Sequence, residues 1–184
     1  EGPSDRIYIN KWLEVFCDSK FIEGSDYQFL YYGGKVLSHY SADESAQTDL
    51  ISILTTNQNS AIVIDSDRRQ KKSKINNTKV RIRDEFSRIK GFCWITQGKE
   101  IENYIPAAAI NSKYGSTLAN IDQFGLFPEY IAKIQKNFSN QKVPFAKGIV
   151  PHITKENSCE MLDLEKQIKK LYETIQKWNR ISQN

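Results

Sequence analysis

The sequence predicts an α/β domain with a largely parallel sheet, because strand patterns and helix patterns alternate along the chain. The clearest strand is Ala-Ile-Val-Ile at residues 61–64, a short, wholly apolar run bounded by polar residues. Such a run is typical of a strand that is buried on both faces of a parallel sheet. A second strand is predicted at residues 91–96, and a short amphipathic helix at residues 80–89 separates the two.

The remaining elements are predicted from turn residues and apolar spacing. A Gly-Pro turn within residues 1–5 leads into a helix whose apolar residues recur at helical spacing: Ile9, Trp12, Leu13 and Phe16. The aromatic run at residues 27–32 predicts a strand that ends at a Gly-Gly turn. Helices are predicted at residues 43–56, within residues 99–110, where a proline limits the start, and at residues 128–138.

The last part of the chain has a different pattern. From residue 157, apolar residues fall at alternating spacings of three and four, with charged residues between them: Met161, Leu164, Ile168, Leu171, Ile175 and Trp178. This predicts a long amphipathic helix that packs on the sheet or pairs with another helix. We therefore predict a main domain at residues 1–152 and a C-terminal helical extension at residues 153–184.

Composition and cysteine usage narrow the class of protein. The 184 residues suffice for one well-cored domain, and the longest apolar runs fall far short of the roughly 20 residues of a spanning helix. No secretory signal opens the chain, so we expect no membrane contact. Three widely spaced cysteines, Cys17, Cys93 and Cys159, argue against a disulfide framework or a zinc site. They predict buried, reduced thiols in the cytoplasm, and the two histidines, His39 and His152, are left out of the candidate site.

Positive charge is concentrated in one segment, although the net charge is only +4. Between residues 68 and 83 there are eight basic residues and no acidic one: Arg68, Arg69, Lys71, Lys72, Lys74, Lys79, Arg81 and Arg83. This density is expected of a surface that neutralises phosphates. A solvated loop and helix face would give the same pattern, so the charge run alone leaves both interpretations open.

Carboxylates follow predicted strands or begin predicted helices at three places. Asp65 and Asp67 come directly after the first buried strand, where ligands of a parallel sheet gather. Clustered carboxylates are costly to ionise without a cation between them, and Mg²⁺ and Mn²⁺ prefer oxygen ligands. Glu1 and Asp5 flank the first turn, and Glu102 follows the second strand. Each place is weak evidence by itself, because turns and helix caps use the same residues.

Taken together, the three acidic segments resemble the successive motifs of the Toprim domain in OLD-family (overcoming lysogenization defect) nucleases. They read Glu-Gly-Pro-Ser-Asp at residues 1–5, Ile-Val-Ile-Asp-Ser-Asp at residues 62–67 and Glu-Ile-Glu-Asn-Tyr at residues 100–104. Their order and spacing both fit the family. The resemblance implies a Toprim-like fold, with a mainly parallel four-stranded sheet flanked by helices, and an enzyme that cuts DNA with two divalent ions, Mg²⁺ or Mn²⁺.

The resemblance also implies roles for single residues. The implied metal ligands are Glu1, Asp5, Asp65, Asp67 and Glu102, with Glu1 as an alternative general base. A catalytic lysine is implied at Lys142 or Lys147, with Lys142 favoured, and would offset the charge that develops on the phosphate. The basic segment between residues 68 and 83 would track the DNA backbone without reading its sequence.

Two features of the family are absent from this sequence. Family members carry a hydrophobic strand directly before the first motif and usually an ABC-type ATPase domain upstream, whereas this sequence begins at Glu1 and contains no GxxxxGK[ST] motif. We therefore expect a fragment whose first strand is missing upstream, with an ATPase domain in the same polypeptide that would also carry any homo-oligomer contact. The function expected is a metal-dependent DNA endonuclease or nickase in phage defence or DNA processing.

Two alternatives remain open at this point. The first keeps the Toprim chemistry but changes the reaction to primase-like nucleotidyl transfer. The second is a non-catalytic DNA-binding or partner-binding module, in which the acidic residues are helix caps and the terminal helix docks on a neighbour.

Overall fold

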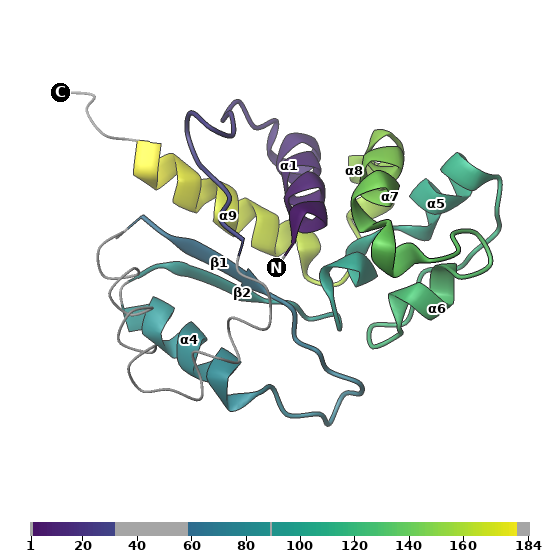
Figure 1. Cartoon of the computed structure of the whole chain (residues 1–184). Coiled ribbons are helices and arrows are strands. Elements are labelled where there is room, and N and C mark those ends of the chain that lie inside the picture. The colour runs from purple at the N-terminus through teal and green to yellow at the C-terminus, as the bar shows by residue number, and fades with distance from the viewer. Residues whose placement is uncertain (1, 32–58, 89, 180–184) are drawn as a thin grey trace.

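The computed structural model describes residues 2–31, 59–88 and 90–179 (Figure 1). In chain order the elements are α1 (Pro3–Cys17), β1 (Ala61–Ile64), α4 (Asn77–Arg88), β2 (Phe92–Ile95), η1 (Ile101–Tyr104), α5 (Ala107–Tyr114), α6 (Phe127–Ile131), η2 (Phe138–Asn140), α7 (Lys142–Ile149), η3 (Val150–His152), α8 (Lys155–Ser158) and α9 (Leu164–Asn179), where η denotes a 3₁₀ helix. The described residues therefore form a small sheet surrounded by helices.

The sheet consists of β1 and β2, which pair in parallel and are joined through α4. Ala61 lies opposite Phe92, and Ile64 lies opposite Ile95, so the two strands begin and end at the same level. Helix α4 covers one face of the pair, while α1 and α9 lie on the other (Figure 1). The predicted burial of β1 on both faces is confirmed for the α4 face, at Ile62 and Ile64, whereas Ala61 and Val63 on the other face are partly buried against the larger core.

Two apolar clusters hold the strands in this position. The smaller cluster lies under α4 and consists of Ile62, Ile64, Ile82 and Phe86. The larger cluster includes Phe92 and Trp94 of β2 together with buried residues of α1, α5, α7 and α9. Because alternate residues of a strand point to opposite faces, β1 directs its buried residues to α4 and β2 directs its own to the larger core.

Helix α9 is the long amphipathic helix that the sequence predicts. Its buried face consists of Leu164, Ile168, Leu171 and Ile175, and these residues belong to the larger core beside α1 and β2. The two predicted arrangements, packing on the sheet and pairing with another helix, therefore occur together, because α9 packs against both α1 and β2. The boundary predicted after residue 152 stays a prediction. In the described part of the chain, no helix has both the length and the apolar character needed to cross a membrane.

The predicted four-stranded sheet is wrong for the described residues, which contain two strands. Residues 27–31, most of a predicted strand, form only an isolated bridge between Glu23 and Tyr27. The Tyr27 hydroxyl donates to Asn10 Oδ1 of α1 at 2.8 Å, and Phe29 packs against the larger core. The extended segment is thus held by helices, and its alternating burial imitates the pattern of a strand. The helix predicted at residues 43–56 lies outside the described residues.

The single helix predicted at residues 128–138 is also wrong, because α6 ends at Ile131. In one continuous helix Phe127 and Phe138 would lie about 16 Å apart along the axis. Their ring centroids are instead 4.9 Å apart, and the Phe138 ring lies 5.1 Å from that of Phe145. Burying these rings together requires the chain to reverse, and Asn137 adopts a left-handed conformation (φ 57°) at that point.

The three cysteines are free thiols, as predicted, but they are less buried than expected. Cys17 and Cys93 are partly buried, and Cys159 is exposed. Burial raises the pKa of the Cys93 thiol to about 11, which keeps it protonated at neutral pH. The prediction of burial is therefore wrong for Cys159, which lies at the exposed end of α8.

Candidate active site

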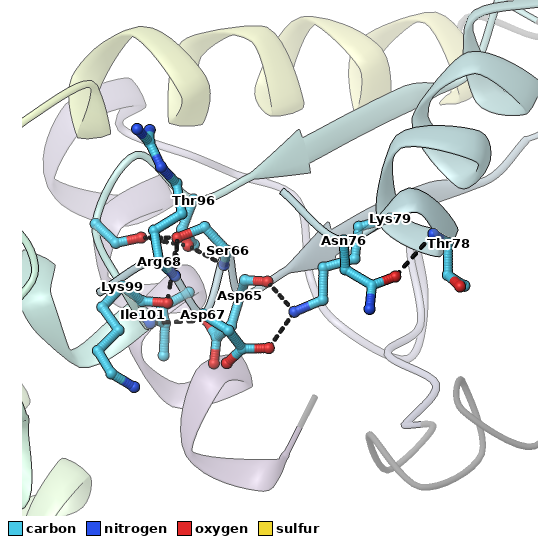
Figure 2. Close-up of polar contacts among 11 residues, drawn as sticks. Asp65, Ser66, Asp67, Arg68, Asn76, Thr78, Lys79, Thr96, Lys99 and Ile101 are labelled. Carbon is cyan, nitrogen blue, oxygen red and sulfur yellow. Dashed lines mark hydrogen bonds and ion pairs between the residues drawn. The ribbon is translucent and has the colours of Figure 1, made fainter. Parts of the chain in front are cut away.

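Parallel pairing brings the residues after the two strands to one edge of the sheet. Asp65 follows the last residue of β1, and η1, which carries Glu102, comes shortly after the end of β2. The amide N–H of Ile101 donates to Asp65 Oδ1 at 2.8 Å, so the Asp65 carboxylate caps the start of η1 (Figure 2). This one hydrogen bond ties the second acidic motif of the sequence to the third.

The loop that carries the two aspartates is fastened through Ser66. The Ser66 N–H donates to Thr96 Oγ1 at 2.8 Å, and the Ser66 hydroxyl donates to the Gly98 carbonyl at 2.6 Å (Figure 2). The N–H of Asp67 donates to the Lys99 carbonyl at 2.9 Å. Ser66 and Thr96 are both buried, so these bonds are shielded from water. They fix the direction in which the two neighbouring aspartates leave the backbone.

Glu102 is the most deeply buried acid of the site, with only 1% of the residue exposed. Its Oε1 forms an ion pair with Lys142 Nζ at 2.9 Å, and its Oε2 has no hydrogen-bond partner among the described residues. Burial raises the pKa of the Glu102 carboxyl, and the Lys142 charge opposes that rise. The charged form of Glu102 is thus stable in this buried place only beside a positive charge such as that of Lys142.

Lys142 supplies that positive charge from the first residue of α7. Burial by itself would lower the pKa of Lys142, but the charges of Glu102, Glu100 and Asp65 outweigh burial and raise it. Its Nζ lies 3.9 Å from Glu100 Oε2 as well, and 36% of its side chain remains exposed. Lys147 is five residues later, about 140° around the helix, and is exposed. The structure therefore brings Lys142, and not Lys147, to the acidic residues.

The first acidic motif lies at the start of α1. Asp5 Oδ2 accepts from the Gly2 N–H at 3.0 Å, and Asp5 Oδ1 accepts from the Ser4 hydroxyl at 3.2 Å, so Asp5 is a helix cap. Its charge still acts on the site, because it contributes to the raised pKa of Glu102. Glu1 lies outside the described residues, and its predicted roles stay predictions.

Asp67 has different surroundings from Asp65. Its side chain is 68% exposed and forms an ion pair with Lys79 of α4, whose ammonium also donates to the Asp65 carbonyl at 2.7 Å (Figure 2). The backbone of Asp67 is left-handed, with φ 56°. The two aspartates of one motif are thus held by different partners: Asp65 by the start of η1, and Asp67 by Lys79.

The implied five-ligand metal set does not form a complete group among the described residues. In that part of the chain no three Asp, Glu, His or Cys side chains lie close enough together to hold an ion. Mg²⁺, however, commonly takes one or two protein carboxylates and completes its shell with water and substrate phosphate. Glu102, buried and with an unpartnered oxygen, and Asp65, which follows the neighbouring strand, have the chemistry for such a site.

The eight basic residues between positions 68 and 83 divide into three groups. Three on α4 have acidic partners: Lys79 with Asp67, Arg81 with Glu85, and Arg83 with Asp84. Arg68 is used by its own loop, since its guanidinium donates to the carbonyls of Ser73 and Lys71 and lies 5.2 Å from the centroid of the Phe124 ring. The other four are exposed and have no ion pair among the described residues: Arg69, Lys71, Lys72 and Lys74.

Nothing matches this chain in comparisons with protein-family models, with curated proteins or with solved structures. The resemblance to the Toprim domain of OLD-family nucleases therefore stays a prediction that rests on the three acidic motifs.

Several residues that shape the site were not selected from the sequence. Ser66 anchors the aspartate loop, and Glu100 lies beside Lys142. Tyr8 is buried on α1, and its hydroxyl has no hydrogen-bond partner among the described residues. Burial, followed by the charges of Glu102 and Asp5, raises the pKa of Tyr8. A signal for Tyr8 exists in the sequence, because it lies one helical turn after Asp5 and so shares its face.

Proposed function

We propose that this chain hydrolyses phosphodiester bonds in DNA with the help of a divalent cation, Mg²⁺ or Mn²⁺. One observation carries the proposal: the buried Glu102 carboxylate, with Lys142 Nζ at 2.9 Å, belongs to η1, and the N–H of its neighbour Ile101 binds Asp65 at the carboxyl edge of two parallel strands. Buried charges of this kind are costly to stability, and they cluster in functional sites. A purely structural pair would be replaceable by apolar residues at little cost.

Each residue of the site has a separate proposed role. The carboxylates of Asp65 and Glu102 would hold the cation, and Asp5 and Asp67 would add to the negative field around it. The bound cation would activate water and offset charge on the leaving oxygen. Lys142, part of whose side chain is exposed, would offset charge on the scissile phosphate. The exposed cations of the loop, Arg69, Lys71, Lys72 and Lys74, would bind the DNA backbone.

Plasmid nicking tests the proposal, with relaxation of supercoiled DNA measured in Mn²⁺ and in Mg²⁺. Glu102→Gln keeps the shape of the side chain and removes its charge, so we expect nicking to fall by about 100-fold or more, the scale of losing one electrostatic contact to a transition state. Glu160→Gln is the matched control, because Glu160 is exposed and forms no ion pair among the described residues; it should stay within about twofold of wild type. Undiminished nicking by the Glu102→Gln protein would rule the proposal out.

A second candidate has specific support in the local partners of the acids. Asp5 accepts from Gly2, Asp65 accepts from Ile101, and Asp67 pairs with Lys79, which are the contacts of helix caps and loop anchors. A non-catalytic DNA-binding module would need no more than this. The melting temperature in Mn²⁺ separates the two candidates, because an ion at a hundredfold excess over its Kd stabilises the folded state by about 2.7 kcal/mol. A melting temperature that does not respond to Mn²⁺ favours the binding module.

The wider setting is proposed from the motif resemblance alone. We propose that the chain is the nuclease part of a larger ATPase–nuclease polypeptide of the OLD family, that it acts in the cytoplasm, and that DNA is its partner there. Sequencing the coding region upstream of Glu1 tests this setting, since an ATPase domain encoded there is the expected result.

A further inference from the structure

The observation that leads beyond the proposed function is the position of Lys79. In sequence it belongs to the run of eight basic residues between positions 68 and 83, and nothing in that run distinguishes it from its neighbours. In the structure its side chain is only 12% exposed, and its ammonium is engaged by the Asp65–Asp67 loop: it contacts the exposed Asp67 carboxylate and the part-buried Asp65 carbonyl (Figure 2). A lysine held in this way is poorly placed to reach the backbone of DNA.

The place of Lys79 on α4 is unusual for a cation. It lies in the first turn of the helix, where the helix dipole favours an acid, and that turn contains no acidic residue. The negative charge at this helix start comes instead from Asp67, which Lys79 holds beside it. The Lys79 ammonium thus contacts two oxygens, one of a carboxylate and one of a backbone carbonyl. Oxygens of both kinds are also the ligands that hard metal cations prefer.

We propose that Lys79 is a positioning residue of the proposed active site and not a DNA contact: its ammonium is an internal counter-ion for the Asp65–Asp67 loop and competes there with the divalent cation. This inference rests on the proposed function. Lys142 has the matching position at Glu102, so two of the three acidic segments, those of Asp67 and Glu102, carry a lysine that offsets their charge without a metal. A divalent cation that binds the Asp67 carboxylate must either displace Lys79 or bind close to its positive charge, which repels it.

The test compares Lys79→Met with Lys72→Met, which removes an exposed cation from the neighbouring loop. Methionine keeps the apolar stem of lysine and removes the charge. The apparent Mn²⁺ affinity is taken from melting temperature against Mn²⁺ concentration. We expect Lys79→Met to bind Mn²⁺ more tightly, by at least about threefold, because an ammonium a few ångströms from a divalent ion repels it. Lys72→Met should keep the wild-type Mn²⁺ affinity, and so should Lys79→Arg, which keeps the charge.

The second measurement is DNA affinity in EDTA, from fluorescence anisotropy of a labelled duplex at salt concentrations between about 50 and 200 mM. Each lost phosphate contact lowers the slope of log affinity against log salt by about 0.9. Lys72→Met should show that loss, whereas Lys79→Met should keep the wild-type slope. General structural damage cannot imitate this pair of results, since damage weakens Mn²⁺ binding. If Lys79→Met does not fold, Lys79→Gln, which keeps a donor for the Asp65 carbonyl, should give the same direction.

The outcomes separate this inference from the proposed function. A salt slope that falls in Lys79→Met as in Lys72→Met makes Lys79 a DNA contact and overturns the inference. Mn²⁺ affinity that is unchanged or weaker in Lys79→Met overturns it as well, and leaves the proposed function in place. A wild-type protein that neither binds Mn²⁺ nor nicks DNA overturns both.

Discussion

Two parts of the same sheet edge, the rim around Glu102 and the loop around Asp67, each hold an acid against a lysine. Glu102 is 1% exposed and its lysine reaches it from α7, whereas the Asp67 side chain is 68% exposed and its lysine reaches it from α4. The chemical pair is the same in both. Burial differs, and burial decides what the pair contributes to stability.

An exposed ion pair contributes about 0–1 kcal/mol, because water screens the attraction and two long side chains lose freedom. Removing one partner of a buried pair costs about 3–5 kcal/mol, because the other charge is left without compensation. The Glu102 rim is thus the part in which stability and the proposed chemistry depend on the same atoms. In the Asp67 loop, backbone hydrogen bonds through Ser66 hold the structure, and the lysine acts mainly on charge.

The largest effect is expected from Lys142→Met, which leaves the Glu102 carboxylate without its cation. We expect the free energy of unfolding to fall by about 3 kcal/mol at neutral pH, the low end for a broken buried pair, since Lys142 is partly exposed. Urea denaturation in the presence of EDTA measures it. Lys147→Met, on the exposed side of the same helix, should stay within about 0.5 kcal/mol of wild type. Equal losses in both variants would mean that α7 itself, and not the ion pair, is at stake.

The pH dependence of this loss identifies its cause. Burial raises the pKa of Glu102 above its ordinary value near 4.5, so the folded chain binds that proton more tightly than the unfolded chain does. The stability gained from protonation is fully present below pH 4.5 and is lost as pH rises through the raised pKa. The deficit of Lys142→Met should therefore be largest at neutral pH and narrow toward pH 4.5. In a Glu102→Gln background the deficit should not change with pH over that interval.

A smaller effect is expected from Ser66→Ala in the Asp67 loop. The Ser66 hydroxyl donates to the Gly98 carbonyl, so alanine leaves that buried acceptor with one partner fewer. Because Thr96 still donates to the Gly98 carbonyl, we expect a loss of about 0.5–1.5 kcal/mol in urea denaturation, the usual net contribution of one hydrogen bond. Ser87→Ala, at an exposed position of α4, is the matched control and should be close to neutral. A neutral Ser66→Ala would show that the loop does not depend on this anchor.

Local sequence patterns predict part of the fold and the edge of the sheet at which the candidate site lies. Strands β1 and β2 were predictable as short apolar runs bounded by polar residues, and helices α4 and α9 from apolar residues at helical spacing. Parallel pairing places Asp65 and the chain that follows β2 at one edge, and the hydrogen bond from Ile101 to Asp65 then keeps η1, which carries Glu102, at that edge. The helix predicted at residues 128–138 was wrong because the chain reverses to pack the rings of Phe127, Phe138 and Phe145 together. The spacing of apolar residues in a short segment gives no information about such tertiary contacts.

The sequence could not predict which of the charged side chains are buried. Lys79 and Lys72 belong to the same basic run, yet one is enclosed between two oxygens and the other is exposed. Lys142 and Lys147 lie on the same short helix and differ in the side of the helix from which they project. An error of one or two residues in the predicted helix start would exchange the two sides. The four-stranded sheet came from the motif resemblance, and local motifs do not determine how many strands pair.

The smallest effect on stability is expected from Asp67→Gly. Glycine removes the exposed pair with Lys79, which costs about 0–1 kcal/mol, and adds freedom to the unfolded chain, which costs about 0.5–1 kcal/mol. It also relieves a left-handed backbone at φ 56°, which costs an L-residue about 1–2 kcal/mol. These contributions nearly cancel, so the free energy of unfolding should change by less than about 1 kcal/mol in urea denaturation, while Asp67→Val, branched at the same φ, should lose more. A loss in Asp67→Gly as large as that in Lys142→Met would mean that the ion pair, and not the Ser66 hydrogen bonds, holds the loop.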